Sequence, residues 1–416
     1  MLNLKTIVKV IRLYFYWLLN AWKITYITKE EDNNKNHLLI VPCDPWTGIG
    51  SRGDEAMILS TIQYFKEKSS AIKVSLVMAP DERNKDLDLP GVDVYYCWEK
   101  NVLKNVLELF FNLKPANLVV LGADCMDGFY SPIVSLCLLS ICDLSIRSNI
   151  LTTLLGFSFN NNPSKLLYPA YRICTAKLKF HLRDVISKER FEKFTGRKAT
   201  LVADAAFLMK SNRGGADMLL LDWIKNRKNN QELIVGINVH PMLLDSASKE
   251  SVDSFSFNVA KRLIDILNEH PNVFYLLLPH DNRTNVSDLV CLSIIADFLV
   301  SNGQGERFYF MREVLHAPEI KQICADLDVL ITSRMHLAIA ALGVGVPIMA
   351  ITYQGKFAGL FKHFDLDLSY LLEPNQLEDS SFNVIFQRFI YERKNIASTV
   401  EDHLLQVREK ALNNFV

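Results

Sequence analysis

The stretch that decides the fold is DVLITSRMHLAIAALGVGVPIMAITYQGKFAGLFKHFDL, residues 328–367. It holds an apolar run that ends at Ser333, a short helical pattern from about Arg334 to Gly343, and a second apolar run, VPIMAIT, at 346–352. A strand, a helix and a strand in this order predict a right-handed crossover between parallel strands.

The same alternation of apolar runs and amphipathic segments extends outward in both directions. Further strands are predicted at 37–42, 72–78, 117–122, 149–156, 179–184, 199–204, 233–239, 273–279 and 307–311. The polar segment KSNRGGAD, 210–217, interrupts the pattern. We therefore expect an α/β protein with two doubly wound, Rossmann-like domains, 37–212 and 213–379, and a C-terminal helical tail, 380–416.

The composition agrees with this architecture and excludes some partners. The chain has 416 residues, 49% of them hydrophobic, which is enough for two domains with separate cores. Lys and Arg total 46 and Asp and Glu total 46, so no overall positive field exists to attract nucleic acid. The 8 cysteines form no C-x-x-C pair. We expect thiols in a reducing compartment, no bound metal and no cofactor.

Residues 1–36 form a basic amphipathic segment and a polar linker. The apolar part of 1–27 is about half the ~20 residues that span a bilayer, so we expect no membrane span. On a helix the cationic residues, with Tyr16 and Asn20, lie along one face; these cations are Lys5, Lys9, Arg12 and Lys23. Two alternatives follow, a helix at a membrane interface and a helix packed on the protein's own surface.

Candidate site residues follow the predicted strands, because ligands bind beyond the carboxyl ends of parallel strands. In 328–367, the start of a helix, Arg334 and His336 predict an anion site, and the next strand brings Tyr353 and Lys356 to the same edge. Two further strands of this domain end at His240 and at His280-Asp281, which we expect to line the same site.

The first strand is followed by CDPWTGIGSRGDEA, in which Gly48, Gly50 and Gly53 match G-x-G-x-x-G. Asp54 and Glu55 lie where a pyrophosphate would bind and would repel it, which argues against a dinucleotide site. Asp54 either caps the helix or, with Glu55, faces a sugar hydroxyl or a basic partner.

Two more strand ends carry charged residues in the first domain. The turn after 117–122 holds Asp124 and Asp127, which either orient hydroxyl groups, or act as bases, or only shape the turn. Arg183 ends another strand and is either an anion ligand or a surface residue paired with Asp184 or a nearby glutamate.

These residues together resemble the polysaccharide pyruvyl transferase family. The resemblance rests on Gly53-Asp54-Glu55-Ala56, on Arg183-Asp184 with Ser187, and above all on SRMHLAIAALGVGVPI with Y-x-x-K, and it spans about 38–365. It implies a two-domain fold of the GT-B type and transfer of pyruvate from phosphoenolpyruvate to sugar hydroxyls of a cell-surface polysaccharide or its lipid-linked precursor, giving a ketal. It also implies donor binding by Arg183, Arg334, His336 and Lys356.

The residue types suit this chemistry. Cations around a helix start fit a compact polyanion such as phosphoenolpyruvate. His336 is our candidate general acid, because histidine side chains titrate near neutral pH. The candidate bases are Asp54, Glu55, Asp124 and Asp127; Tyr353 and His280 are expected to contact substrate.

Some features depart from the family and leave alternatives. The family often has a glycine run where this chain has Gly122-Ala123-Asp124, which affects acceptor recognition, and residues 1–27 lie outside the resemblance. An interfacial segment would hold a cytoplasmic enzyme near a lipid-linked glycan. The alternatives are a GT-B-like glycosyltransferase with a nucleotide-sugar donor and a catalytically silent member of a glycan assembly complex.

Overall fold

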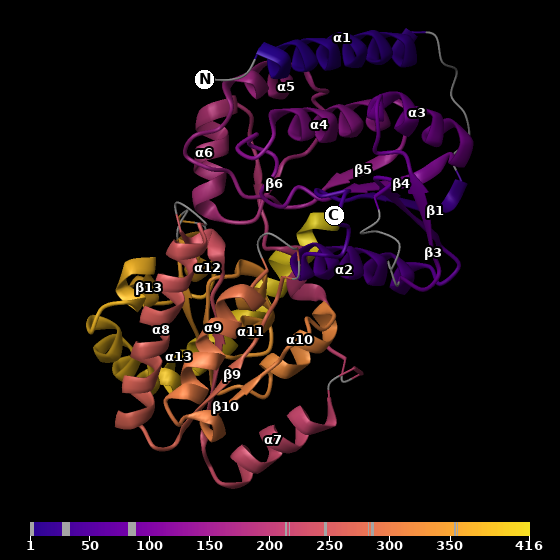
Figure 1. The fold of residues 1–416 in the computed structure, drawn as a ribbon. Helices are drawn as coiled ribbons and strands as arrows, with labels where there is room; N and C mark the ends of the chain where they lie inside the picture. Colours follow the sequence, from indigo (N-terminus) through magenta and orange to yellow (C-terminus); the bar gives the residue numbers. More distant parts are fainter. Residues whose placement is uncertain are drawn as a thin grey trace. The chain divides into compact units, whose positions relative to one another are not determined.

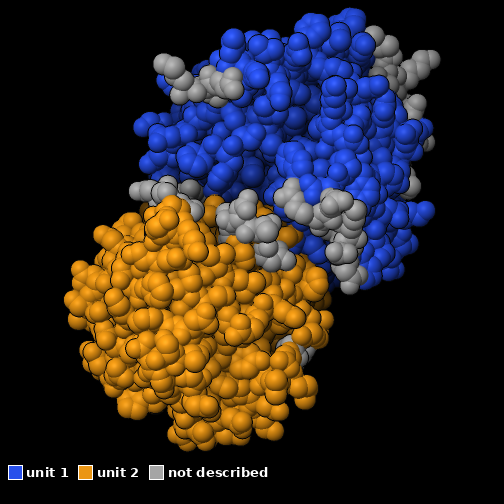
Figure 2. Space-filling view, in the orientation of Figure 1, with its two compact units in different colours: residues 1–49, 56–209, 408–416 blue, residues 50–55, 210–407 orange. Residues whose placement is uncertain are grey.

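A computed structural model describes residues 4–26, 34–81, 89–212, 214–215, 217–244, 248–281, 283, 287–352, 355 and 357–416. The chain forms two compact units, coloured separately in Figure 2. Unit 1 contains residues 1–49, 56–209 and 408–416, and unit 2 contains residues 50–55 and 210–407. Two predicted site residues, Tyr353 and Lys356, lie outside the described residues.

Unit 1 is built on a parallel sheet whose strand order, within the described residues, is β3-β2-β1-β4-β5. The strands are β1 (Asn34–Val41), β2 (Lys73–Met78), β3 (Val92–Tyr96), β4 (Pro115–Val120) and β5 (Leu151–Leu154). The order reverses between β1 and β4, so right-handed crossovers place helices on both faces. Figure 1 shows α2 (Arg52–Lys68) on one face and α3 (Val102–Leu113) and α4 (Pro132–Arg147) on the other.

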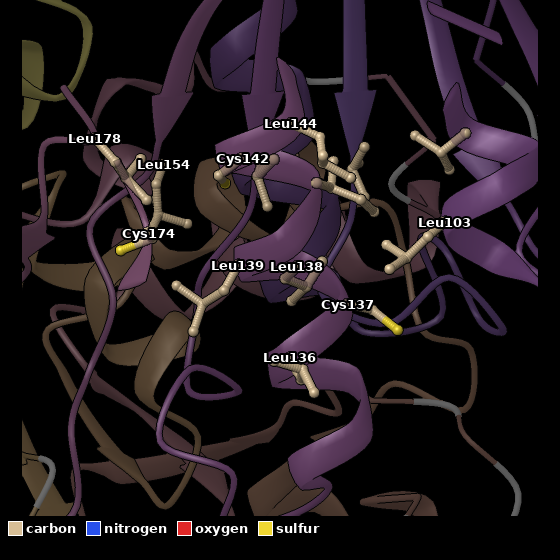
Figure 3. Packing of buried hydrophobic residues seen from close by; sticks show 14 of the residues in the cluster. Leu103, Leu136, Cys137, Leu138, Leu139, Cys142, Leu144, Leu154, Cys174 and Leu178 are labelled. Carbon is tan, nitrogen blue, oxygen red and sulfur yellow. The ribbon is translucent and has the colours of Figure 1, made fainter. Parts of the chain in front are cut away.

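The helix α1 (Leu4–Tyr26) packs on the outer side of α4 and so belongs to unit 1 (Figure 1). Trp17 is 1% exposed, and its indole N–H donates to Asp143 Oδ2 over 2.8 Å. The hydroxyl of Tyr14 donates to Leu166 O over 2.7 Å. One face of α1 therefore joins the core that α4 builds over the sheet, part of which is drawn in Figure 3.

A small extension continues unit 1 beyond β5. The strands β6 (His181–Leu182) and β7 (Thr200–Leu201) pair in parallel, and Phe157 bridges to Leu182. Two helices, α5 (Tyr168–Ile173) and α6 (Val185–Thr195), flank them. Asp184 is the N-cap of α6 and accepts from the Ser187 backbone N–H (2.7 Å) and hydroxyl (2.6 Å).

Unit 2 has a second parallel sheet with the order β10-β9-β8-β11-β12-β13 in its described residues. Its strands are β8 (Leu233–Asn238), β9 (Val273–Leu277), β10 (Phe308–Phe310), β11 (Val329–Thr332), β12 (Ile348–Ile351) and β13 (Leu371–Leu372). Its helices are α7 (Met218–Asn229), α8 (Lys249–Glu269), α9 (Leu289–Ser301), α10 (Ala317–Cys324), α11 (Met335–Leu342) and α12 (Phe357–His363). The order reverses between β8 and β11, which again places crossover helices on opposite faces.

The long helix α13 (Ser381–Leu412) follows, as expected for a C-terminal helical tail. All the predicted apolar strands form, and the expected α/β class with two doubly wound sheets is confirmed. Two edge strands, β3 and β13, were not predicted. Among the described residues, no helix has the length and apolar character that crossing a bilayer requires.

Candidate functional site

The reversal of strand order in unit 2 brings several predicted residues to neighbouring strand ends. His240 follows β8, His280 follows β9, and Arg334 and His336 follow β11, while the sheet order is β9-β8-β11. Ligands in doubly wound sheets bind at this reversal, beyond the carboxyl ends of the strands. The local sequence explains the placement, because each of these residues comes within a turn or so of the end of a fully buried strand.

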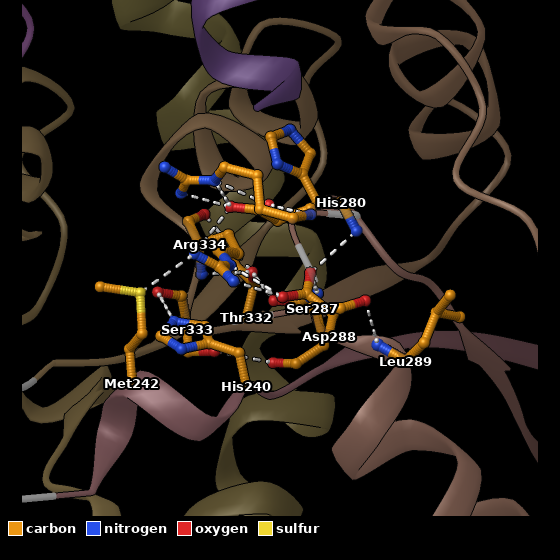
Figure 4. A network of polar contacts seen from close by, with 12 residues as sticks. His240, Met242, His280, Ser287, Asp288, Leu289, Thr332, Ser333 and Arg334 are labelled. Carbon is orange, nitrogen blue, oxygen red and sulfur yellow. Dashed lines mark hydrogen bonds and ion pairs between the residues drawn. The ribbon is translucent and has the colours of Figure 1, made fainter. Parts of the chain in front are cut away.

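Arg334 is held by two buried carboxylates (Figure 4). Its Nε and Nη2 donate to Asp288 Oδ1 over 2.8 and 2.7 Å, and its Nη1 lies 3.2 Å from Asp281 Oδ2. Asp281 also pairs with Arg283, with Nη2 2.6 Å from Oδ2. The guanidinium of Arg334 is therefore fixed in direction at the N-cap of α11.

Asp288 is the buried centre of this network. Its Oδ2 accepts from Asn238 Nδ2 and from the His280 backbone N–H, each over 2.8 Å. Burial raises the pKa of Asp288, and the Arg334 guanidinium opposes that rise. The carboxyl group thus links the ends of β8, β9 and β11 through hydrogen bonds.

Two histidines beside this network are kept neutral by burial. Burial lowers the pKa of His240 well below its usual value, as does Arg334, and its Nε2 lies 3.2 Å from Ser333 O. Because a carbonyl only accepts, Nε2 carries the proton in this contact. Burial also lowers the pKa of His280, together with the charges of His336, Arg334 and Arg52. A neutral histidine binds or donates a hydrogen bond without adding charge.

The segment after β1, called the first loop here, includes the first turn of α2 and meets this site through Gly53, which belongs to unit 2 with residues 50–55. A Cβ atom on Gly53 would lie 2.1 Å from His336 Nδ1, so only glycine permits this approach. Ser51 forms an antiparallel bridge with Asp281. The third glycine of the G-x-G-x-x-G match therefore makes room for a histidine ring.

Glu55, two positions after Gly53, is committed to contacts within unit 2. Glu55 is 2% exposed and accepts from His316 Nδ1 (2.6 Å), the Ala317 backbone N–H (3.0 Å) and Arg52 Nη1 (3.2 Å). It thus satisfies an N–H group in the first turn of α10. Asp54 is buried inside the first turn of α2, which begins at Arg52.

Arg183 lies in unit 1, at the end of β6, and is 3% exposed. Its Nη1 donates to Asp204 Oδ2 over 2.8 Å and its Nε to Ser158 Oγ over 2.7 Å. Burial acts to lower the pKa of Arg183, but Asp204 and Asp124 outweigh it and the pKa is raised. This arginine is buried and forms an ion pair with Asp204, whereas the alternative expected a surface arginine paired with Asp184 or a nearby glutamate.

The two acids of the turn after β4 differ in their surroundings. Asp127 is 1% exposed and accepts from the Phe129 and Asn160 backbone N–H groups over 2.8 and 2.9 Å, which shapes the turn. Asp124 is half-buried and close enough to Arg183 to affect its charge. Unit 1 therefore gathers Asp124, Arg183 and Asp204 at strand ends of its own.

Unit 2 thus brings together Arg334, His336, His280 and the loop with Asp54 and Glu55, whereas Asp124, Asp127 and Arg183 belong to unit 1. The sequence missed the partners Asp288, Arg283, His316 and Asp204. Only Asp288 carried a signal, as an acid before the apolar helix α9, and that pattern indicates a cap. Chemically, the unit 2 cluster offers oriented N–H donors and histidine side chains that can bind an anion and move a proton.

Comparison with solved structures supports the fold. MnaA from S. aureus, solved with UDP, has a TM-score of 0.55 at 10% identity, covering 86% of this chain and 90% of that one. A glycosyltransferase from Rickettsia africae has a TM-score of 0.54 at 11% identity, covering 92% of this chain and 99% of that one. A trehalose-phosphate synthase from Burkholderia vietnamiensis gives 0.51 at 11% identity, with coverages of 92% and 96%. At these identities the likeness shows the fold alone, and it confirms the GT-B-like architecture.

Comparison with curated proteins found no match by sequence. The model of the family described as polysaccharide pyruvyl transferase matches residues 52–355. This range covers well over half of the chain. It begins at the loop that contacts His336 and includes every strand end described above except those of β1 and β13. The chain is therefore an enzyme of the polysaccharide pyruvyl transferase family.

Proposed function

We propose that the protein transfers the pyruvyl group of phosphoenolpyruvate to two hydroxyl groups of one sugar, in a cell-surface polysaccharide or its lipid-linked precursor. The observation that carries this proposal is the convergence of Arg334, His336 and His280 at neighbouring strand ends, where the sheet order reverses. Family membership supports phosphoenolpyruvate as donor and a polysaccharide as acceptor.

The reaction has two stages whose atoms balance. In the first, an acceptor oxygen bonds to C2 of phosphoenolpyruvate, its proton is lost to a base, and C3 gains a proton to become a methyl group. In the second, the bond between C2 and the phosphate oxygen breaks, the second hydroxyl bonds to C2, and its proton is released. The products are a ketal and inorganic phosphate.

His336 is the group that we assign to proton delivery at C3. Arg334 binds the donor in a direction that Asp288 and Asp281 fix, with His280 as a neutral neighbour. Arg52, Arg283 and Arg334 each pair with an acidic residue, which offsets part of their positive charge. We therefore assign the remaining contacts to the phosphoenolpyruvate anion to N–H groups in the first turn of α11 and to Lys356. Tyr353 and Arg183 stay predicted donor contacts.

For the base we favour Asp54, which adjoins Gly53 and so lies in the loop that contacts His336. Glu55 and Asp127 already accept several hydrogen bonds, which suits positioning roles. Asp124 in unit 1 stays a predicted acceptor contact. A glycan or lipid-linked oligosaccharide acceptor would be met in the cytoplasm, at the inner face of the membrane.

Phosphate release from phosphoenolpyruvate, measured with lipid-linked glycan from the source cell, tests the proposal. We expect His336→Gln to slow release by about 100-fold or more, because a positioned general acid contributes that much. Arg334→Ala should slow it too, although it also leaves Asp288 buried without its guanidinium partner. His403→Gln and Arg388→Ala, on α13, are matched controls and should keep full activity.

The variants must melt near the wild-type temperature for the comparison to hold, and His336→Gln is the milder change because its side chain is half-buried. Release that survives both site variants would overturn the assignment. A nucleotide-sugar donor is the competing function, favoured only by the fold likeness to enzymes such as MnaA. Stabilisation by UDP-sugars, with none by millimolar phosphoenolpyruvate, would support that competitor.

A further inference from the structure

The helix α1 has three faces instead of the two that its sequence pattern suggested. At 3.6 residues per turn, one face holds the residues buried against unit 1, which include Val10, Trp17, Ala21 and Ile24. A second face holds the cations Lys5, Lys9, Arg12 and Lys23, all exposed. The third face is apolar and points to solvent, although the helix is already packed.

This outward apolar face is contiguous. Leu4, Val8, Ile11, Phe15, Leu18, Leu19 and Trp22 are all exposed and fall within about 100° of the helix circumference. Leu4 is 74% exposed, Phe15 70% and Ile11 61%. Scattered exposed apolar residues are ordinary, but a continuous stripe of this kind marks an interaction surface.

The charges beside the stripe indicate its partner. The sequence of α1 contains four cations and no Asp or Glu. A second copy of this helix would therefore offer more cations and no carboxylate of its own to pair with them. An anionic lipid surface instead offers acyl chains for the stripe and negative headgroups for the neighbouring cations. Trp22 and Phe15 also suit the boundary between headgroups and acyl chains.

We propose that α1 binds the surface of an anionic membrane, with the stripe defined above inserted into the lipid and its cationic face at the headgroups. The buried face stays on α4, so the helix lies in the plane of the membrane and holds unit 1 there. The helix need not leave the protein to bind, because the stripe is already exposed. This surface is distinct from the residues assigned to pyruvyl transfer.

Flotation of the purified full chain with vesicles tests the inference. We expect binding to vesicles that contain phosphatidylglycerol and little binding to pure phosphatidylcholine. Binding should weaken between about 0.15 M and about 1 M salt, because salt screens the cations. Neither phosphoenolpyruvate nor glycan is present, so the result is separate from the test of pyruvyl transfer.

The apolar contribution is tested with Ile11→Asn, Phe15→Asn and Leu18→Asn combined. The matched control replaces similarly exposed apolar residues of α13, namely Val384→Asn, Tyr391→Asn and Leu405→Asn. The stripe variant should lose at least about tenfold in vesicle binding, and the control should bind as wild type. Equal melting temperatures would show that both variants fold.

The electrostatic contribution is tested with Lys9→Gln, Arg12→Gln and Lys23→Gln combined. Its control removes three exposed lysines of unit 2 with Lys249→Gln, Lys261→Gln and Lys394→Gln. Each cation near an anionic surface adds to the free energy of membrane binding. The α1 variant should therefore bind at least about tenfold more weakly, while the control should bind as wild type.

Three outcomes would overturn the proposal: no flotation with anionic vesicles, equal binding by the stripe variant and wild type, or equal binding to neutral and anionic vesicles. Light scattering after size exclusion gives a fourth. If the wild type is a dimer, the stripe variant is a monomer and neither protein floats, the stripe binds a second copy of the chain instead of lipid.

Discussion

Asp288 shows how much of the site depends on one buried carboxyl group. It is fully buried, and Arg334, Asn238 and the His280 backbone all donate to it. A carboxylate satisfied in this way fixes its partners, because moving any of them would leave a charge or a polar group buried without compensation. The direction of the Arg334 guanidinium is therefore a property of Asp288 as much as of Arg334.

Replacing the Asp288 carboxylate should destabilise the folded protein even without substrate. We expect Asp288→Asn to lower the free energy of unfolding by about 3 kcal/mol, because it leaves the Arg334 charge largely buried without its main partner. Urea unfolding measures the loss. The double variant Asp288→Asn/Arg334→Met should recover part of it, since both charges are then gone. A loss below about 1 kcal/mol would show that the pair is not tightly coupled.

At the scale of elements, the start of α10 is joined to the first loop. Glu55 accepts from His316 Nδ1 and from the Ala317 N–H, the first N–H group of the helix. This hydrogen bond to Glu55 raises the pKa of His316, against the opposing effect of burial. The loop that contacts His336 is therefore anchored partly through a titrating side chain.

The raised pKa predicts a pH dependence of stability. A folded pKa above the unfolded value of about 6.5 means that the contribution is full below that pH and is lost as pH rises through the folded value. We expect His316→Gln to lower the melting temperature more at about pH 6 than at about pH 9. The corresponding difference in the free energy of unfolding between the two pH values should stay below about 1 kcal/mol, because the His316 side chain is 45% exposed.

A matched control separates this contact from general effects of histidine. His403→Gln on α13 removes a histidine whose Nδ1 lies 2.8 Å from a backbone carbonyl, that of Thr399. Its effect at each of the two pH values is subtracted from that of His316→Gln. If no pH dependence remains, the Glu55 contact does not carry the expected charge.

The elements that the sequence predicted well are those with buried, continuous apolar runs. The residues of β8, β9 and β11 are all buried, which matches the unbroken apolar pattern of central parallel strands. The edge strand β3 has no fully buried residue, only half-buried and exposed ones, and β13 spans only Leu371–Leu372. Neither strand contains an apolar run long enough to predict a strand from the sequence.

The candidate site was predictable where its residues follow a strand directly. Arg334 and His336 lie just beyond β11 because a local strand and helix pattern fixes that position. Their partners come from distant parts of the chain: Asp288 is 46 positions from Arg334, and Glu55 is 261 positions from His316. No local pattern encodes such contacts, so the sequence predicted the side chains of the site without the network that orients them.

At the scale of the whole molecule, neither unit is one continuous piece of chain. Residues 50–55 belong to unit 2, and residues 408–416 return to unit 1. In unit 1, Phe415 stacks on Tyr64 with ring centroids 4.2 Å apart. The buried Asn414 accepts from the Gly156 N–H over 2.7 Å and donates to Ala203 O over 2.9 Å.

Asn414 should therefore control the stability of unit 1 more than that of unit 2. Asn414→Ala leaves the Gly156 N–H and the Ala203 carbonyl buried without this partner, which costs about 1 to 3 kcal/mol per group. Hydrogen exchange should quicken in β5 and β7 and stay unchanged in β8 and β11. Asn413→Ala, at the exposed neighbouring position, is the control. Equal acceleration in both units would contradict this assignment.

The return of residues 408–416 also sets an order of events during synthesis. At translation rates of roughly 5 to 20 residues per second, the chain between residues 209 and 408 takes about 10 to 40 s to make. Throughout that time the sheet of unit 1 lacks Asn414 and Phe415. Residues 50–55 are already made, but most of the unit 2 residues that they contact are not. The nascent protein therefore carries two incomplete units on the ribosome, and unit 1, although almost all of it is made first, is the last to be completed.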